Sequence, residues 1–387
     1  MTSSDQLLQV LQQRGVSRRL FLKYCASTAA LLGLPLSQVD QLAHALEKAQ
    51  RRSVVWLSFQ ECTGCTESLT RAYQPSIEQL ILDILSLDYH HTLQAASGRA
   101  AEAARVEALR AAKGQAILVV DGSIPLNDHG ACCTIAGRSS LDLLKESVAA
   151  CNTVVAVGSC AAFGGLPMAQ PNPTGAQSME QLMQSGQLPK RSLINLPGCP
   201  PVPELMAALL SHLITFKKVP ELDELNRPRM FYGETVHQRC SRLHFYEQGK
   251  FAKRFDDEGA RKGWCLYELG CRGPVTYNAC TRIGWNNNTS DPIRSGHPCL
   301  GCSEPEFWDH DRFYTPVQLD VNVAGAQGKD IYDSHCVYCH SDDPNSLRTA
   351  TEQIPAKLNR DAVRAHRFEL DEASIRALQD YIRESRK

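Results

Sequence analysis

The sequence has almost no excess of charge and no long hydrophobic run. Its 387 residues carry 41 Lys and Arg against 42 Asp and Glu, a formal net charge of −1. The net charge therefore gives no indication of nucleic acid or an anionic membrane surface as a partner. The apolar stretches are shorter than the roughly 20 residues that a membrane-spanning helix needs, so we expect no transmembrane anchor in this chain.

Cysteine, by contrast, is abundant, with 16 residues. In a small secreted protein that number would indicate disulfides, but this chain is long and several cysteines form C-x-x-C pairs or lie beside histidines. Metal ligation is the better interpretation. The length exceeds what one ordinary domain needs, so we expect two or three modules.

The N-terminal segment contains the pair Arg18 and Arg19, followed by a mildly apolar run over residues 24–36. Paired arginines before such a run are typical of a twin-arginine export signal, although an ordinary amphipathic helix is the alternative. The twin-arginine pathway carries folded proteins, which suits a chain that binds its metals on reduced thiolates in the cytoplasm. The pattern predicts a periplasmic protein.

Apolar strands and helical stretches alternate between residues 53 and 215. The predicted strands cover residues 54–57, 116–120, 153–157 and 193–196. The predicted helices cover residues 100–112, 138–150 and 179–185, with another after Pro203. This alternation predicts an α/β fold with a doubly wound parallel sheet, of the flavodoxin-like kind.

Four cysteines follow three of these strands. They are Cys62, Cys65, Cys160 and Cys199. Because the carboxyl ends of parallel strands meet at one edge of a sheet, we expect the four thiols to converge there. Four thiolates on glycine-containing turns suit a [4Fe–4S] cluster, whereas a structural zinc site, the alternative, usually takes ligands from paired local knuckles.

Two further ligand sets lie in a region, residues 228–308, where regular apolar patterning fades. The second set is His237, Cys240, Cys265 and Cys271, and the third is Cys280, Cys299 and Cys302. One histidine with three cysteines makes a four-ligand site, whereas three cysteines alone match a [3Fe–4S] cluster. A segment with so little apolar patterning needs its metals to hold it together.

From about residue 18 to residue 308 the chain resembles the small subunit of nickel–iron hydrogenases. The stretches that carry the resemblance are residues 61–68 (ECTGCTES), 121–125 (DGSIP), 158–165, 195–201, 270–274 (GCRGP) and 297–308. The resemblance implies that the first ligand set holds a proximal [4Fe–4S] cluster, the second a distal [4Fe–4S] cluster and the third a medial [3Fe–4S] cluster. It also implies a partner, the large subunit, which contains the nickel–iron centre and splits dihydrogen. No catalytic residue is then expected in this chain, whose role is electron conduction.

The C-terminal tail departs from that family, because it carries a Cys336-x-x-Cys339-His340 motif typical of covalent haem c attachment. The two cysteines would bind the haem, and His340 would be an axial ligand of its iron. A zinc knuckle is the alternative. The last methionine is Met230, so we expect His366 as the second axial ligand, with an open position or a lysine as the other possibilities. Without a methionine ligand the haem potential should be low, which favours a cytochrome-type electron acceptor.

These observations predict five segments. They are an export signal with a linker (1–50), the flavodoxin-like domain with the proximal cluster (51–227), an irregular domain with the distal and medial clusters (228–313), a linker (314–327) and a small all-α cytochrome c-like domain (328–387).

Cys132, Cys133 and Cys151 are expected to be buried structural thiols, although a role near a cluster stays open for Cys132 and Cys133. Glu67 has a role near the proximal cluster or in proton exit, or it is an ordinary carboxylate at a helix start.

Three other functions are compatible with parts of the pattern. A quinone-linked dehydrogenase subunit of the complex I type shares the cluster-bearing sheet but should lack the second and third ligand sets. A hydrogen-sensing regulatory protein should lack the export signal and the haem motif. A free-standing electron carrier would need no protein partner, so a stoichiometric nickel-containing companion would exclude it.

Overall fold

The computed structural model describes the chain from Arg51 to Asp309, except Gln74, together with a few residues near each end. The described residues outside that stretch are 25, 26, 29, 30, 35, 313–315, 328–332, 336, 354 and 372–385. The predicted export-signal and haem residues that lie outside the described residues are Arg18, Arg19, Cys339, His340 and His366.

The chain forms two units. The first comprises residues 1–233, 283–289 and 302–310, and the second comprises residues 234–282, 290–301 and 311–387.

A five-stranded parallel sheet forms the centre of the first unit. Its strands are β1 (Arg52–Ser58), β2 (Leu85–His90), β3 (Gly114–Asp121), β6 (Cys151–Val157) and β7 (Ser192–Leu196). Their order in the sheet is β2-β1-β3-β6-β7. In chain order this is 2-1-3-4-5, the order of flavodoxin-like folds, so the predicted α/β class and parallel sheet are confirmed. The central strands are buried apolar runs because helices cover both faces of the sheet.

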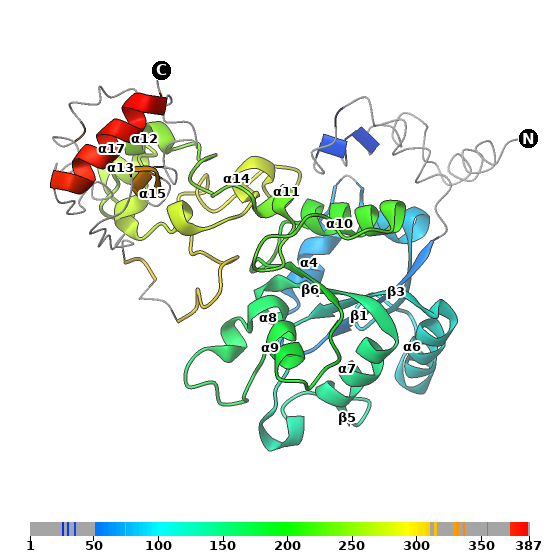
Figure 1. Cartoon of the computed structure of the whole chain (residues 1–387). Coiled ribbons are helices and arrows are strands. Elements are labelled where there is room, and N and C mark those ends of the chain that lie inside the picture. The colour runs from blue at the N-terminus through cyan, green and yellow to red at the C-terminus, as the bar shows by residue number, and fades with distance from the viewer. Residues whose placement is uncertain are drawn as a thin grey trace, which may run out of the picture. The chain divides into compact units, whose positions relative to one another are not determined.

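Helices lie on both sides of this sheet, with α4 and α10 on one side and α6 and α7 on the other (Figure 1). The longer helical elements of this unit are α4 (Gly64–Thr70), α6 (Gly98–Ala112), α7 (Ser140–Ala149), α8 (Gly158–Phe163), α9 (Met179–Gln184) and α10 (Pro203–Phe216). The shorter ones are α5 (Ile77–Gln79), the π-helix η2 (Leu80–Ile84), the 3₁₀ turns η3 (Asn127–Gly130) and η4 (Leu166–Met168), and α11 (Arg229–Tyr232).

Two details of this unit differ from the sequence-based expectation. Strand β2 was not predicted, because its alternation of polar and apolar residues lacks the continuous apolar run of the central strands. The helix expected over residues 138–150 begins only at Ser140, since Arg138–Ser139 forms a short strand, β5, paired with β4 (Thr134–Ile135). The Ser139 hydroxyl accepts a hydrogen bond from the Asp142 N–H, so it caps the helix at that point.

The second unit has little regular structure among its described residues. Its helical elements are α12 (Leu243–Glu247), α13 (Glu258–Arg261), the 3₁₀ turns η5 (Tyr267–Leu269) and η6 (Gly273–Val275), α15 (Gly328–Ile331) and α17 (Glu372–Ser385); α14 (Cys280–Ile283) ends in the first unit. A small core of Tyr246, Phe251, Cys265 and Tyr267 packs inside it. The irregular character agrees with the fading periodicity of the sequence.

In the tail, helix α17 packs against α15. The rings of Tyr332 and Tyr381 lie 5.6 Å apart at this contact. A cytochrome c-like fold of the tail stays a prediction. Across the part of the chain that the structure describes, no helix combines the length and the apolar character that crossing a bilayer requires.

Candidate electron-transfer sites and the family of the chain

The first ligand set converges as the sequence predicts. Cys62 lies between β1 and α4, Cys65 lies in α4, Cys160 lies in α8 and Cys199 follows β7. Burial raises the pKa of the Cys65, Cys160 and Cys199 thiols, that of Cys160 to about 12, and the neighbouring thiols of the set raise them further. This mutual influence places all four thiols in one neighbourhood, which we call the four-cysteine site. An anionic thiolate is costly there unless a positive group compensates it, and an iron–sulfur core is such a group.

Glycines line the four-cysteine site where side chains would fill it. A Cβ on Gly158, whose φ is +79°, would overlap the Cys65 Sγ atom. A Cβ on Gly165, whose φ is +62°, would lie 2.5 Å from the Cys160 Sγ atom. Among the described residues, no three His, Cys, Asp or Glu side chains are grouped closely enough to hold a single metal ion. A cubane cluster makes a different demand, one thiolate for each iron, and these glycines leave backbone close to the sulfur atoms.

Asp121 also lies at this site, although the sequence indicated it only as the first residue of the DGSIP stretch. It ends β3, is fully buried and interacts with the Cys65 thiol. Burial, and then the charge of Glu61, raise the pKa of Asp121 to about 7. Its position was the available signal, because a carboxylate at the carboxyl end of a buried parallel strand lies where such folds place their sites.

Ser159 ties three backbone segments of the first unit together. Its hydroxyl accepts a hydrogen bond from the Gly198 N–H at 3.0 Å and donates one to the Cys302 carbonyl. Its own N–H donates to the Gly198 carbonyl at 3.0 Å. The segments that carry Cys160, Cys199 and Cys302 are therefore linked through one buried side chain.

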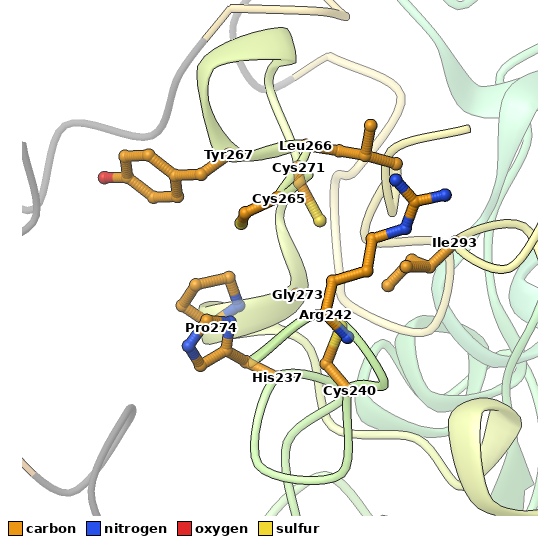
Figure 2. Close-up of a pocket in the computed structure, with 10 residues that line it drawn as sticks. All are labelled: His237, Cys240, Arg242, Cys265, Leu266, Tyr267, Cys271, Gly273, Pro274 and Ile293. Carbon is orange, nitrogen blue, oxygen red and sulfur yellow. The ribbon is translucent and has the colours of Figure 1, made fainter. Parts of the chain in front are cut away.

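The second ligand set lines a pocket in the second unit (Figure 2). The lining residues are His237, Cys240, Arg242, Cys265, Leu266, Tyr267, Cys271, Gly273, Pro274 and Ile293. All four predicted ligands are thus brought together, and we call the pocket the His237 site. The ring of Tyr246 packs edge-on against the His237 imidazole at 4.6 Å, which restricts its orientation.

The thiols of the His237 site are strongly perturbed. Burial raises the pKa of Cys271 well above its ordinary value, and the Cys299 thiol raises it further. Burial also raises the pKa of Cys240. The Cys299 N–H donates to the Cys271 Sγ atom at 3.3 Å, so a residue of the third ligand set directly contacts the second.

The third ligand set is divided between the two units. Cys280 and Cys299 are buried residues of the second unit, whereas Cys302 belongs to the first. The joint site of these three cysteines stays a prediction. In the tail, Cys336 is the only residue of the haem motif among the described residues, and it is partly buried.

The expectations for the remaining cysteines need a correction. Cys151 is buried, as expected, but Cys132 is exposed and Cys133, which packs against the core, is only partly buried, because both lie in the turn between η3 and β4. Glu67 lies in the first turn of α4 and forms an ion pair with Arg71 at 2.6 Å on an exposed surface. The structure therefore favours the ordinary helix-start carboxylate for Glu67.

Known proteins resemble both units. Residues 62–213 match the sequence family of the 20 kDa subunit of NADH ubiquinone oxidoreductase, and residues 232–315 match the C-terminal family of NiFe/NiFeSe hydrogenase small subunits. The uptake hydrogenase small subunit of Afipia carboxidovorans is 42% identical over 327 residues, which cover 84% of this chain and 88% of that protein. The chain belongs to the NiFe hydrogenase small subunits. The Escherichia coli K12 hydrogenase-1 small chain is 41% identical over 325 residues, which cover 84% of this chain and 86% of that one.

A solved structure supports the same family. The small subunit is similar to a chain of the [NiFeSe] hydrogenase of Desulfomicrobium baculatum, with a TM-score of 0.64, 34% identity, and coverage of 70% of this chain and 100% of that one. The match over residues 62–213 reflects the sheet shared with complex I subunits, while the match over residues 232–315 is specific to hydrogenases. The small subunit is therefore the electron-transfer component of a hydrogenase whose active site is on the large subunit.

Proposed function

We propose that this small subunit conducts electrons from dihydrogen oxidation on the large subunit through three iron–sulfur clusters to a C-terminal haem c. A cytochrome-type protein would then accept them. The observation that carries the proposal is the convergence of Cys62, Cys65, Cys160 and Cys199 from three separate segments onto one edge of the sheet. When bound, an iron–sulfur cluster supplies a site that gains and loses one electron with little movement.

The proposed proximal cluster is an ordinary [4Fe–4S] cubane with four thiolate ligands. Gly64 and Gly165 lie beside the Cys62 and Cys160 sulfur atoms, and glycine cannot ligate iron. Oxygen-tolerant hydrogenases resemble this chain but have extra cysteines at those two positions. A redox titration should therefore show one electron per proximal cluster, and two electrons within a narrow potential range would contradict this assignment.

The proposed distal cluster is a [4Fe–4S] cluster held by His237, Cys240, Cys265 and Cys271, and its support is the pocket that these four residues line. The proposed medial cluster is a [3Fe–4S] cluster held by Cys280, Cys299 and Cys302. Pro292 lies between Cys280 and Cys299, where a fourth ligand would be required, and proline has no donor side chain.

The proposed haem is attached through Cys336 and Cys339, with His340 and His366 as axial ligands. The absence of methionine after Met230 supports a second histidine. In the purified full-length complex, His366→Ala should convert a low-spin haem spectrum to a high-spin one. An unchanged low-spin spectrum would mean that another residue, such as Lys357, holds the iron.

The proposed location is the periplasm, reached by the twin-arginine pathway, with the large subunit as the stoichiometric partner. The test is purification of the native complex through this small subunit. We expect a nickel-containing companion, iron and sulfide for three clusters, and one covalent haem. A chain that purifies alone with its clusters would instead support a free-standing electron carrier.

A further inference from the structure

Arg242 is a buried cation in the wall of the His237 site. It is the N-terminal flanking residue of α12, and only 9% of its surface is exposed. Its guanidinium Nη1 donates a hydrogen bond to the Trp264 carbonyl at 2.8 Å. Figure 2 shows the side chain extending along the pocket from the Cys240 side toward Leu266. The charge of Arg242 is therefore held in a fixed place beside the four predicted ligands.

No carboxylate compensates this charge within the described residues. Two nearby arginines do have acidic partners, since Arg239 pairs with Glu234 at 2.6 Å and Arg294 pairs with Asp291. The Arg242 guanidinium donates to the Trp264 carbonyl, and the contact of Arg242 with the Cys240 thiol is made by its main-chain N–H. Burying a charge without a partner is strongly unfavourable, so we expect an anionic group in the space that Arg242 faces.

Arg242 also contacts one wall of that space through its main chain. Its main-chain N–H donates a hydrogen bond to the Cys240 Sγ atom at 3.3 Å. This hydrogen bond stabilises negative charge on the sulfur of a predicted ligand, and it is stronger in a desolvated site than it would be in water.

We infer that Arg242 is the counter-charge of the distal cluster and raises its reduction potential, which favours the arrival of electrons from the other clusters at the His237 site. The inference rests on the proposed function. Reduction adds one electron to a group whose thiolates already make it anionic, and no bond forms or breaks. A neighbouring cation stabilises the reduced state more than the oxidised state, so the equilibrium shifts toward reduction.

The test compares the distal cluster potential in three variants of the purified complex, measured by redox titration of its electron paramagnetic resonance signal. Arg242→Gln removes the charge, and Arg242→Lys keeps it. Arg239→Gln is the matched control, because Arg239 is only three residues away but its side chain is 60% exposed and paired with Glu234. We expect Arg242→Gln to lower the equilibrium constant for reduction at least tenfold, a shift of about 59 mV for one electron. Arg242→Lys and Arg239→Gln should stay near the wild-type potential.

Each alternative result is decisive. An intact cluster in Arg242→Gln with the potential of the Arg239→Gln control would overturn the inference. If Arg242→Gln loses the distal cluster but Arg242→Lys retains it, the result supports a role for the charge. If both variants lose the cluster, Arg242 only holds the loop through its hydrogen bond to Trp264. A wild-type complex without a distal cluster signal would overturn the proposed function itself.

Discussion

At the scale of single residues, the four-cysteine site depends on positions where only glycine fits. Gly158→Ala should abolish the proximal cluster, because the new Cβ would overlap the Cys65 Sγ atom and the backbone φ of +79° disfavours any side chain. We expect the purified variant to lose the iron and sulfide of one cluster, as measured by chemical analysis.

Gly186→Ala is the matched control for this prediction. Gly186 has a similar φ of +76°, but a Cβ there would meet no atom within 4 Å. The control should cost about 1 kcal/mol of stability and keep all iron. Equal iron content in Gly158→Ala and Gly186→Ala would show that the space beside Cys65 is not needed for the cluster.

His90, at the end of β2, makes a second prediction at this scale. Burial, and then the charge of His91, lower the pKa of His90 to about 4 from its ordinary 6.5. The unfolded chain therefore takes up a proton below pH 6.5 while folded His90 stays neutral, so its contribution to stability is constant above pH 6.5 and declines as the pH falls toward 4. Between pH 7.5 and pH 5 this one group should cost about 2 kcal/mol.

Urea unfolding across that pH range can isolate the effect of His90. His90→Gln should show a flatter dependence of the unfolding free energy on pH than the wild type. His244→Gln is the control, because His244 is exposed and should keep the wild-type slope. A His90→Gln slope equal to that of His244→Gln would show that His90 is not held neutral.

At the scale of elements, the site depends on how separate loops are joined rather than on any one helix. Ser159 connects such loops, because its hydroxyl accepts a hydrogen bond from the Gly198 N–H and donates one to the Cys302 carbonyl. Ser159→Ala would leave the buried Gly198 N–H and the partly buried Cys302 carbonyl without that partner, at an expected cost of about 1–3 kcal/mol in urea unfolding. Because the Cys302 segment loses its connection, the three-iron signal should also broaden.

Ser159→Thr provides the comparison for that variant, because it keeps a hydroxyl in the same position. It should retain most of the stability and an unchanged three-iron signal. If Ser159→Ala and Ser159→Thr gave the same unfolding free energy and the same spectrum, the hydroxyl would not be what links these loops.

At the scale of the whole molecule, the proposed function predicts that assembly is divided between two compartments. The proposed clusters need reduced thiolates in the cytoplasm, whereas covalent attachment of the proposed haem takes place outside it, so the tail should cross the membrane without haem. Changing Arg18 and Arg19 to lysine should leave a cytoplasmic, cluster-bearing and haem-free protein. Cell fractionation followed by haem staining and iron analysis measures both properties.

Arg14→Lys is a suitable control for the export prediction, because Arg14 lies near the pair but outside it. This variant should still be exported and carry haem. Haem-loaded protein in the cytoplasm of the Arg18 and Arg19 double variant would contradict the proposed order of assembly.

The sequence by itself determined the parallel sheet, and it predicted the ligand groups. Continuous apolar runs identify β1, β3, β6 and β7 because a strand buried on both faces must be apolar along its whole length. The cysteines that follow these strands could be assigned to one edge for the same topological reason. The second ligand set was predicted from residue types and their order along the chain, and its four residues line one pocket.

Tertiary structure decided what depends on contacts between distant segments. Edge strand β2 has no continuous apolar run, so its pairing with β1 became visible only in the folded sheet. Three further features also depend on residues that are distant in the sequence. They are the exposure of Cys132, the overlap that excludes a side chain at Gly158, and the hydrogen bond of Arg242 to Trp264. Hydrophobic period and residue type report which face of an element is buried, whereas burial and charge at a particular atom depend on which segments pack around it.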